Sequence, residues 1–314
     1  MIKQAFFKGK NKKRRYFEGW YFKCISADRK HAIAIIPGMA IDPQGERHAF
    51  IQVIDAVSGK TWYHHFAYTA FRAFSDRFDV EIENNAFNGE GLSLNINSGE
   101  GCLSGRLTFH NSHPFPSGRK SPGIMGPFDW LPFMECYHAI IHLYHEIKGE
   151  IELDGELLDF NGGVGYIEKD YGRSFPKTYL WLQASHFEGK NASFVFSRAR
   201  IPFLGWEFPG FFAYFTDFET ITVRFASYNF SQLVEWEVDK EKGTCLGKIE
   251  GPDGILSFKA RMVGGGRLRA PVDGLMDREI IESITADVSV RLTDKQGKLL
   301  FDSNSSEAGM EICL

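Results

Sequence analysis

Turn-forming residues recur along this chain at the spacing of β-hairpins, and this regularity constrains its fold more than any other feature. Between the turns lie short runs rich in β-branched and aromatic residues, such as 50–56, 92–96, 137–147 and 286–292. Short strands separated by turns about every 8–12 residues are typical of a β-sandwich or β-barrel. Helical periodicity is confined to short segments near 66–74 and 230–240. The sequence therefore predicts an all-β protein.

The length of 314 residues is enough for two domains or for one large β unit. A break at Asn161-Gly162-Gly163 indicates a boundary near residue 158, which divides the chain into 1–158 and 159–314. The chain has 29 Phe, within an aromatic content of 15%. Aromatic side chains favour strands and form rigid apolar surfaces. This composition fits either a Phe-rich β core or the wall of a cavity for an apolar ligand.

A net charge of −4 gives the chain no general attraction for nucleic acid. Basic residues nevertheless crowd the first part of the chain, at Lys8, Lys10, Lys12, Lys13, Arg14 and Arg15. Such a run is typical of a solvated arm, and the alternative is contact with an anionic surface, such as a membrane or an acidic group of a ligand. No apolar stretch reaches transmembrane length, and no hydrophobic signal segment follows the basic run. We therefore expect a cytoplasmic protein, with peripheral membrane contact as the alternative role of the basic run. Five scattered cysteines without a CxxC pair fit reduced thiols.

Three motifs carry a resemblance to a known family. Residues 16–23 read YFEGWYFK, residues 163–176 read GVGYIEKDYGRSFP, and residues 181–187 read WLQASHF. These resemble the signature blocks of the tocopherol cyclase family, with Tyr171 where a Trp is usual and Ser185 where an Asn is usual. Further similar segments lie at 126–138, 201–205 and 282–284, so the resemblance extends over the whole chain. The chain is also distantly similar to lipocalin-like carotenoid hydratases.

The resemblance implies two lipocalin- or calycin-like antiparallel β-barrel or sandwich units that enclose an apolar cavity. It also implies a redox-neutral reaction, in which a phenol oxygen adds across a prenyl double bond to close a chroman ring without a cofactor. That is the work of an intramolecular lyase or isomerase on a hydrophobic small molecule, an isoprenoid or a prenylated aromatic compound. The residues expected to bind this molecule are Glu18, Trp20, Trp181, Gln183, His186 and Trp206.

The parity of a strand at 166–170 predicts a reactive face. Because successive side chains alternate, Tyr166, Glu168 and Asp170 should point to one side, and Lys169 to the other. Two carboxyls beside an apolar surface favour a neutral acid near pH 7, which olefin protonation needs. We therefore expect these three residues to be catalytic. The alternative is a structural ion pair of the carboxyls with Lys169 or Arg173.

Two irregular segments are expected to cover the ligand. Residues 110–134 are rich in Pro and Gly, and their apolar end, 128–133, is predicted to cap part of the fold. Residues 201–215 are the most aromatic stretch and contain Trp206. Their prolines and glycines favour a lid for a lipophilic tail, and a core strand with a wrapped loop is the alternative.

The histidines do not predict a metal site. The β-branched pair at 140–141 favours a strand, in which His138 and His142 would lie roughly 13 Å apart at about 3.3 Å per residue. His145 continues the same strand, and the neighbours His64 and His65 would face opposite sides.

Three functions remain open from the sequence. The first is the redox-neutral cyclase, in which Glu168 or Asp170 donates the proton and Tyr166 and Gln183 position the oxygen. The second is a non-catalytic lipocalin-like carrier of a hydrophobic molecule, which the departures at Tyr171 and Ser185 permit. The third is carbohydrate binding by an open aromatic face.

Overall fold

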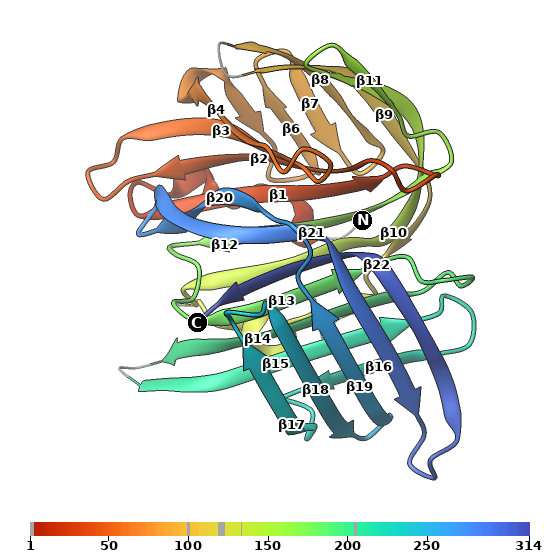
Figure 1. The fold of residues 1–314 in the computed structure, drawn as a ribbon. Helices are drawn as coiled ribbons and strands as arrows, with labels where there is room; N and C mark the ends of the chain where they lie inside the picture. The colour runs from red at the N-terminus through yellow and green to blue at the C-terminus, as the bar shows by residue number, and fades with distance from the viewer. Residues whose placement is uncertain (1–2, 99–100, 119–122, 133, 204–205) are drawn as a thin grey trace. The chain divides into compact units, whose positions relative to one another are not determined.

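The computed structural model describes residues 3–98, 101–118, 123–132, 134–203 and 206–314. Strands make up 66% of the chain and helices 5%, all sheets are antiparallel, and a nearly closed barrel is present, so the predicted all-β class is confirmed (Figure 1). The chain forms two compact units. The first contains Met1–Phe175 and Gly266–Ile280, and the second contains Pro176–Gly265 and Ile281–Leu314.

The first unit is built on a twelve-stranded sheet with the order β4-β3-β2-β1-β12-β10-β9-β8-β7-β6-β5, and β11 pairs with β10. Its strands are β1 (Tyr16–Ile25), β2 (Ala32–Ile41), β3 (Arg47–Asp55), β4 (Thr61–Ala67), β5 (Phe71–Ala73), β6 (Asp79–Ile82), β7 (Asn85–Asn88), β8 (Gly91–Ser98), β9 (Gly101–Pro114), β10 (Cys136–Leu153), β11 (Glu156–Asp159) and β12 (Gly163–Gly172). Most neighbours are joined by the hairpins that the turn signals predict, but β12 is inserted between β1 and β10. Strand β12 lies beyond the boundary expected near residue 158. It nevertheless belongs to the first unit, because its backbone pairs with both β1 and β10.

The interior of the first unit is apolar. Alternating side chains of its strands point inward, including Trp20 and Phe22 of β1 and Ile167 of β12, and they form one core cluster with Phe87 and Phe109. The β20 segment (Gly266–Val272) belongs to the same unit. The side-chain amide of Gln52 in β3 exchanges two hydrogen bonds with the backbone of Arg269, at 3.0 and 2.8 Å.

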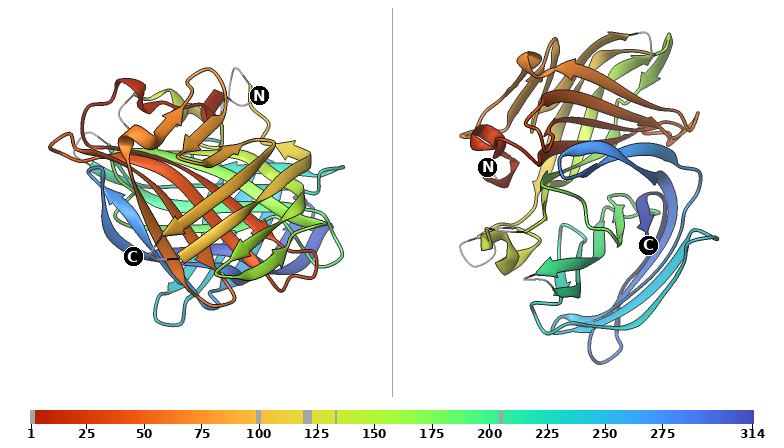
Figure 2. Two further views of the ribbon diagram at one scale, coloured as in Figure 1. Left: turned by 90° about the horizontal axis from the view of Figure 1, so that it is seen from above. Right: turned by 90° about the vertical axis from the view of Figure 1, so that its left-hand side faces the viewer.

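A ten-stranded sheet with the order β16-β15-β14-β13-β22-β21-β19-β18-β17, in which β20 pairs with β21, carries the second unit. Its strands run from green to blue in Figure 2. Its strands are β13 (Tyr179–Ala184), β14 (Ser193–Phe203), β15 (Trp206–Thr216), β16 (Thr222–Ala226), β17 (Gln232–Asp239), β18 (Thr244–Gly251), β19 (Gly254–Arg261), β21 (Leu275–Thr293) and β22 (Leu299–Cys313). Phe194, Phe196, Phe215 and Phe258 lie in its core cluster, so much of the Phe content serves an ordinary β interior.

Three local predictions were wrong. Residues 232–239 form strand β17 instead of a helix. The segment near 66–74 holds the end of β4, the 3-10 turn η3 (Tyr68–Ala70) and strand β5 instead of an α-helix. Within 201–215, the described residues lie in β14 and β15, which pair from Ser193–Thr216 to Phe203–Trp206 in place of the irregular course expected of a lid. Residues 204–205 of this stretch lie outside the described residues. The pairing of β14 with β15 continues through Pro202 and Pro209, so these prolines do not break the strands.

The basic run near the N-terminus is anchored to the first unit. It includes the 3-10 turn η2 (Gly9–Asn11), which follows the turn η1 (Lys3–Ala5). The backbone N–H groups of Lys8 and Gly9 donate to the buried carboxylate of Glu18. The start of this run is therefore ordered by β1, although Lys10, Lys12 and Lys13 keep their side chains exposed. Within the described residues, no helix combines the length and apolar character needed to cross a membrane.

Candidate active site

Strand β12 presents two chemically different faces. Tyr166, Glu168 and Asp170 share one face, as strand alternation predicts, and Ile167 and Lys169 point into the barrel. The hydroxyl of Tyr166 donates to Glu168 Oε2 at 2.7 Å, and both side chains are buried. Asp170 is half-buried at the end of the row. The strand therefore places one phenol and two carboxyl groups side by side.

The neighbouring strand β10 adds His138 to this row. His138 is the cross-strand partner of Asp170, and its Nδ1 lies 3.0 Å from Asp170 Oδ1. Its Nε2 lies 3.5 Å from Glu168 Oε2, the same oxygen that Tyr166 contacts. The imidazole thus bridges the two carboxyls. Sequence reasoning considered His138 only as a metal ligand, because no local signal gives the register of β10 against β12.

The charges around His138 set its protonation. Burial alone would lower the pKa of His138, but the carboxylates of Glu168 and Asp170 outweigh burial and raise it from 6.5 to about 9. Burial and the nearby Glu168 carboxylate raise the pKa of Tyr166 well above its usual value, so its hydroxyl stays a donor. At neutral pH the cluster therefore holds an imidazolium between two acidic groups. The raised pKa therefore favours His138, rather than a neutral carboxyl, as the group that carries the proton.

The predicted cap lies against the strand ends that carry this cluster. Met125 precedes the turn η4 (Gly126–Trp130), and its Sδ accepts a hydrogen bond from the backbone N–H of His138 at 3.1 Å. The hydroxyl of Tyr137 donates to the carbonyl of Leu131, and its ring stacks on Tyr171 with centroids 4.8 Å apart. The second half of the irregular segment thus packs on the strand ends that carry His138 and Asp170.

The same three side chains could also hold a metal ion. One ligand atom from each of His138, Glu168 and Asp170 lies within 4.8 Å of the others. The hydrogen bond from His138 to Asp170 and the raised pKa of the imidazole describe a proton-holding site equally well. We interpret the cluster as a proton site, because a proton satisfies all three groups without a further ligand.

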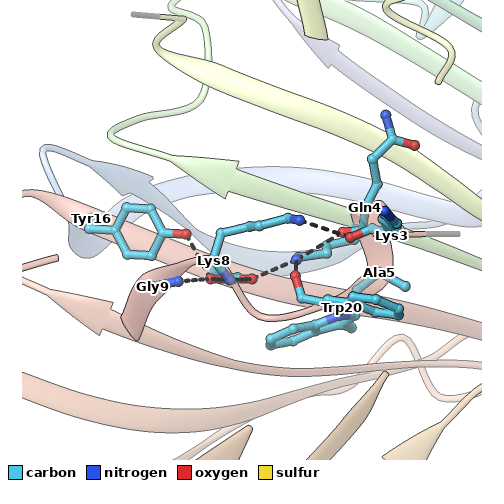
Figure 3. A network of polar contacts seen from close by, with 10 residues as sticks. Lys3, Gln4, Ala5, Lys8, Gly9, Tyr16 and Trp20 are labelled. Atoms are coloured by element: carbon cyan, nitrogen blue, oxygen red, sulfur yellow. Dashed lines mark hydrogen bonds and ion pairs between the residues drawn. The ribbon is translucent and has the colours of Figure 1, made fainter. Parts of the chain in front are cut away.

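The opposite face of β12 carries a closed polar network inside the barrel (Figure 3). Lys169 Nζ lies 2.5 Å from Glu18 Oε1. The indole Nε1 of Trp20 donates to the carbonyl of Ala5 at 2.8 Å. Glu18 and Trp20, both expected to bind substrate, therefore hold the N-terminal segment, and the structure does not bring them to the face of Glu168.

The remaining expected residues lie in the second unit. Trp181 and Gln183 share a buried face of β13 with Tyr179, whose hydroxyl donates to Glu311. Gly309 faces Trp181, and its lack of a side chain leaves space for the indole ring, since a Cβ there would lie 2.6 Å from two ring carbons. His186 follows the end of β13 and is half-buried. The side chain of Trp206 falls outside the described residues.

A separate cavity of about 740 Å³ lies in the second unit. Its lining mixes apolar residues such as Val238 and Ala260 with charged ones such as Lys242, Arg261 and Asp287. It contains neither Trp181 nor Gln183. This lining suits no purely apolar ligand.

Two further histidines lie inside the first barrel. Irregularities in β10 after Ile140 and after His142 turn both His142 and His145 inward, with ring centroids 5.4 Å apart. His145 is fully buried over Gly165, where a Cβ would lie 2.2 Å from its Nε2. Burial lowers the pKa of His142 to about 4 and lowers that of His145 well below its usual value. Both rings are therefore neutral at pH 7.

Comparison with known proteins places this chain in a family. Residues 117–314, well over half of the chain, match the family model described as tocopherol cyclase-like. The chain therefore belongs to the tocopherol cyclase-like family. The match covers β10, β12 and β13, which carry the site residues of both units.

Among curated proteins, the chain is similar to a probable chloroplastic tocopherol cyclase of Oryza sativa subsp. japonica, with 24% identity over 208 residues. It is also similar to a chloroplastic tocopherol cyclase of Zea mays, with 25% identity over 205 residues. Each alignment covers 58% of this chain and 41% of the relative. The chain thus matches about two fifths of the length of these plant proteins.

Solved structures support the fold. A putative AttH from Nitrosomonas europaea superimposes with a TM-score of 0.51 at 13% identity, covering 99% of this chain and 96% of that one. CghA superimposes with a TM-score of 0.57 at 10% identity, covering 95% of this chain and 88% of that one. Both have lipocalin-like folds, so the expected architecture is confirmed.

Proposed function

We propose that this protein is a redox-neutral cyclase that closes an oxygen-containing ring on a prenylated quinol or a related isoprenoid. The observation that carries the proposal is the row formed by Tyr166, Glu168, His138 and Asp170, in which the imidazole lies within 3.5 Å of both carboxyls. Membership of the tocopherol cyclase-like family supports a cyclase-type activity. Together these observations support the proposal of an intramolecular lyase or isomerase.

The reaction needs one proton added to the olefin and one proton removed from the phenol. A proton adds to the less substituted carbon of the prenyl double bond, and the phenol oxygen bonds to the other carbon as its positive charge develops. The phenol then gives up its own proton, so the product is an isomer of the substrate. A cluster with one mobile proton can perform both transfers, and no redox cofactor is required.

Each residue of the row has a role in this scheme. His138 passes its proton through Nε2 to Glu168, 3.5 Å away, and Glu168 delivers it to the olefin. Asp170 holds the imidazole through Nδ1. Tyr166 fixes Glu168 by its hydrogen bond and orients the carboxyl. The carboxylate charge favours the cationic transition state, since preorganised charge acts strongly in a buried site.

Trp181 and Gln183, which lie in the second unit, remain predicted to bind the apolar chain and a substrate oxygen. Trp20 is assigned no such role, because its ring lies on the barrel side of the sheet, 4.9 Å from the ammonium of Lys169. A cytoplasmic location and peripheral membrane contact remain predictions.

The test uses a hydroquinone that carries a prenyl chain next to one hydroxyl. Wild-type protein should convert it to a compound of changed retention time and unchanged mass. In D2O the product should gain one deuterium on the ring carbon next to the new ether carbon. Glu168→Gln and Asp170→Asn should lower turnover about 10²-fold or more, as loss of an acid–base group typically does.

Glu152→Gln is the matched control, because Glu152 is an exposed carboxylate on β10, the strand that carries His138. It should leave turnover unchanged. If wild-type protein binds the quinol and returns it unchanged, the carrier function replaces the cyclase. If Glu168→Gln and Asp170→Asn both retain full turnover, the proton donor lies elsewhere.

A further inference from the structure

Lys169 occupies the position of β12 between the two proposed catalytic carboxyls. Because side chains alternate, its ammonium lies on the barrel side of the sheet, and Glu168 and Asp170 point the other way. We propose that Lys169 is a positioning residue, which fixes this part of β12 through Glu18 and the N-terminal segment 3–9. The proposal rests on the proposed function for the role of the carboxyls.

The ammonium of Lys169 is fully buried and uses all three of its donors. They reach Glu18 Oε1 at 2.5 Å, the carbonyl of Gln4 at 3.0 Å and the carbonyl of Phe6 at 2.6 Å. The rings of Trp20 and Tyr171 each lie 4.9 Å from Nζ. An ammonium has three N–H donors and no acceptor, so no donor remains for a ligand. Lys169 therefore acts on the structure and not on the substrate.

Glu18 closes the network from the other side. Its carboxylate accepts from the backbone N–H groups of Lys8 and Gly9 at 2.9 and 2.8 Å, and from the hydroxyl of Tyr16 at 2.6 Å (Figure 3). With Lys169 these contacts occupy both carboxylate oxygens in a site that is fully buried. The network thus joins β12, β1 and the N-terminal segment at one point.

The pairing of β12 explains why such an anchor matters here. On the β1 side the register runs without interruption from Phe17–Gly172 to Ile25–Val164. On the β10 side it shifts between Ile140 and His142, next to Glu168. Strand β10 alone therefore constrains Glu168 weakly, and the β1 side must set its position. Lys169 ties β12 to that side.

The chemical type of the anchor is also informative. A buried ion pair usually gains little stability over an apolar pair of similar volume, because both charges lose their hydration. What it enforces is one geometry, since any shift leaves a charge unpaired. A shift of about 1 Å at a reacting group can cost about 10²-fold in rate. A buried pair behind the catalytic row suits a positioning role.

The experiment compares the double variant Lys169→Met/Glu18→Gln with the control Arg173→Met/Asp273→Asn. The control removes a partly exposed ion pair of the same unit, with Arg173 Nε and Asp273 Oδ1 2.6 Å apart. The ring protons of His138 are titrated by NMR, and kcat and KM are measured with the prenylated quinol. In wild-type protein the His138 titration reports how closely Glu168 and Asp170 surround it.

The double variant should shift the titration midpoint of His138 down by about one pH unit or more, because the carboxyls no longer hold their distances. Its kcat should fall about tenfold or more with KM within about twofold, as expected for misplacement of a reacting group. The control should match wild type in both readouts. A chain that lacks residues 2–8 should also show a lower His138 titration midpoint and a lower kcat. This chain replaces the double variant in the test if the double variant does not fold.

A folded double variant with an unchanged His138 titration and unchanged kcat would overturn the positioning role. Equal losses in the double variant and the control would also overturn it. The titration does not depend on turnover. If wild-type protein forms no cyclised product, the proposed function fails, and the shift of His138 still decides whether Lys169 positions this row.

Discussion

Acidification should destabilise the first unit through the two histidines inside its barrel. His142 and His145 lie with ring centroids 5.4 Å apart in an apolar interior, and His145 packs on Phe109 at 4.1 Å. Burial lowers the pKa of both, and for His145 the neighbouring His142 lowers it further. Protonation of either ring would place an imidazolium in the core. No carboxylate contributes to the pKa shift of either histidine, so none offsets the cost of this charge. The folded state therefore resists protonation.

The size of the effect follows from His142. Its pKa is about 4 in the folded protein and 6.5 in the unfolded chain. Between these values the unfolded state binds more protons, so this contribution is complete above pH 6.5 and is lost as the pH falls toward 4. One pKa unit corresponds to about 1.4 kcal/mol, which gives a loss of about 2 kcal/mol at pH 5 and about 3 kcal/mol below pH 4. That is a substantial part of the usual stability of a domain, about 5–15 kcal/mol.

The assay is urea unfolding followed by tryptophan fluorescence at pH 7 and pH 5. The variant His142→Phe removes the titrating ring, and Gly89 beside it leaves room for the larger side chain, since a Cβ there would lie 3.7 Å from His142 Nε2. From pH 7 to pH 5 the free energy of unfolding should fall in both proteins. The fall should be about 2 kcal/mol smaller in His142→Phe than in wild type. His110→Phe is the control, because His110 is exposed on β9.

An identical pH dependence in wild type and His142→Phe would refute this reasoning. It would mean that His142 finds a partner on protonation or is solvated in the folded state. A control variant that changes as much as His142→Phe would have the same meaning, because the effect would then not depend on burial.

Three further predictions can be checked directly. Because the carboxylates raise the pKa of His138 to about 9, its imidazolium persists through neutral pH, so turnover should be level from about pH 7 to 8 and should fall above about pH 9, as a pH–rate profile will show; a fall centred near pH 6.5 would contradict the bridged geometry. Gly309→Ala should lower the free energy of unfolding by about 1–3 kcal/mol in urea titrations, since its Cβ would lie 2.6 Å from the Trp181 ring, whereas Gly297→Ala, with open space at its Cβ but a positive φ, should cost less; equal effects would mean that the indole moves aside. Turnover should survive extensive treatment with EDTA, and a loss restored by a divalent ion would identify His138, Glu168 and Asp170 as metal ligands instead.

The sequence alone determined the fold class and one face of the site. Turn signals at hairpin spacing predict an antiparallel all-β chain, because each short strand must pair with its neighbour. Strand alternation places Tyr166, Glu168 and Asp170 together, because side-chain period is a local property of the backbone. The family motifs likewise lie in the strands that carry these side chains.

Only the tertiary structure decided what surrounds that face. His138 joins the row because β10 pairs with β12 in a particular register, which depends on two bulges and on long-range backbone pairing. Lys169 meets Glu18 because β12 is inserted beside β1, about half the chain away in sequence. His142 and His145 share the barrel interior because the bulges break the alternation that the sequence would impose. Local patterning fixes the direction of each side chain along a regular strand, and cross-strand register, which no local pattern encodes, chooses its partners.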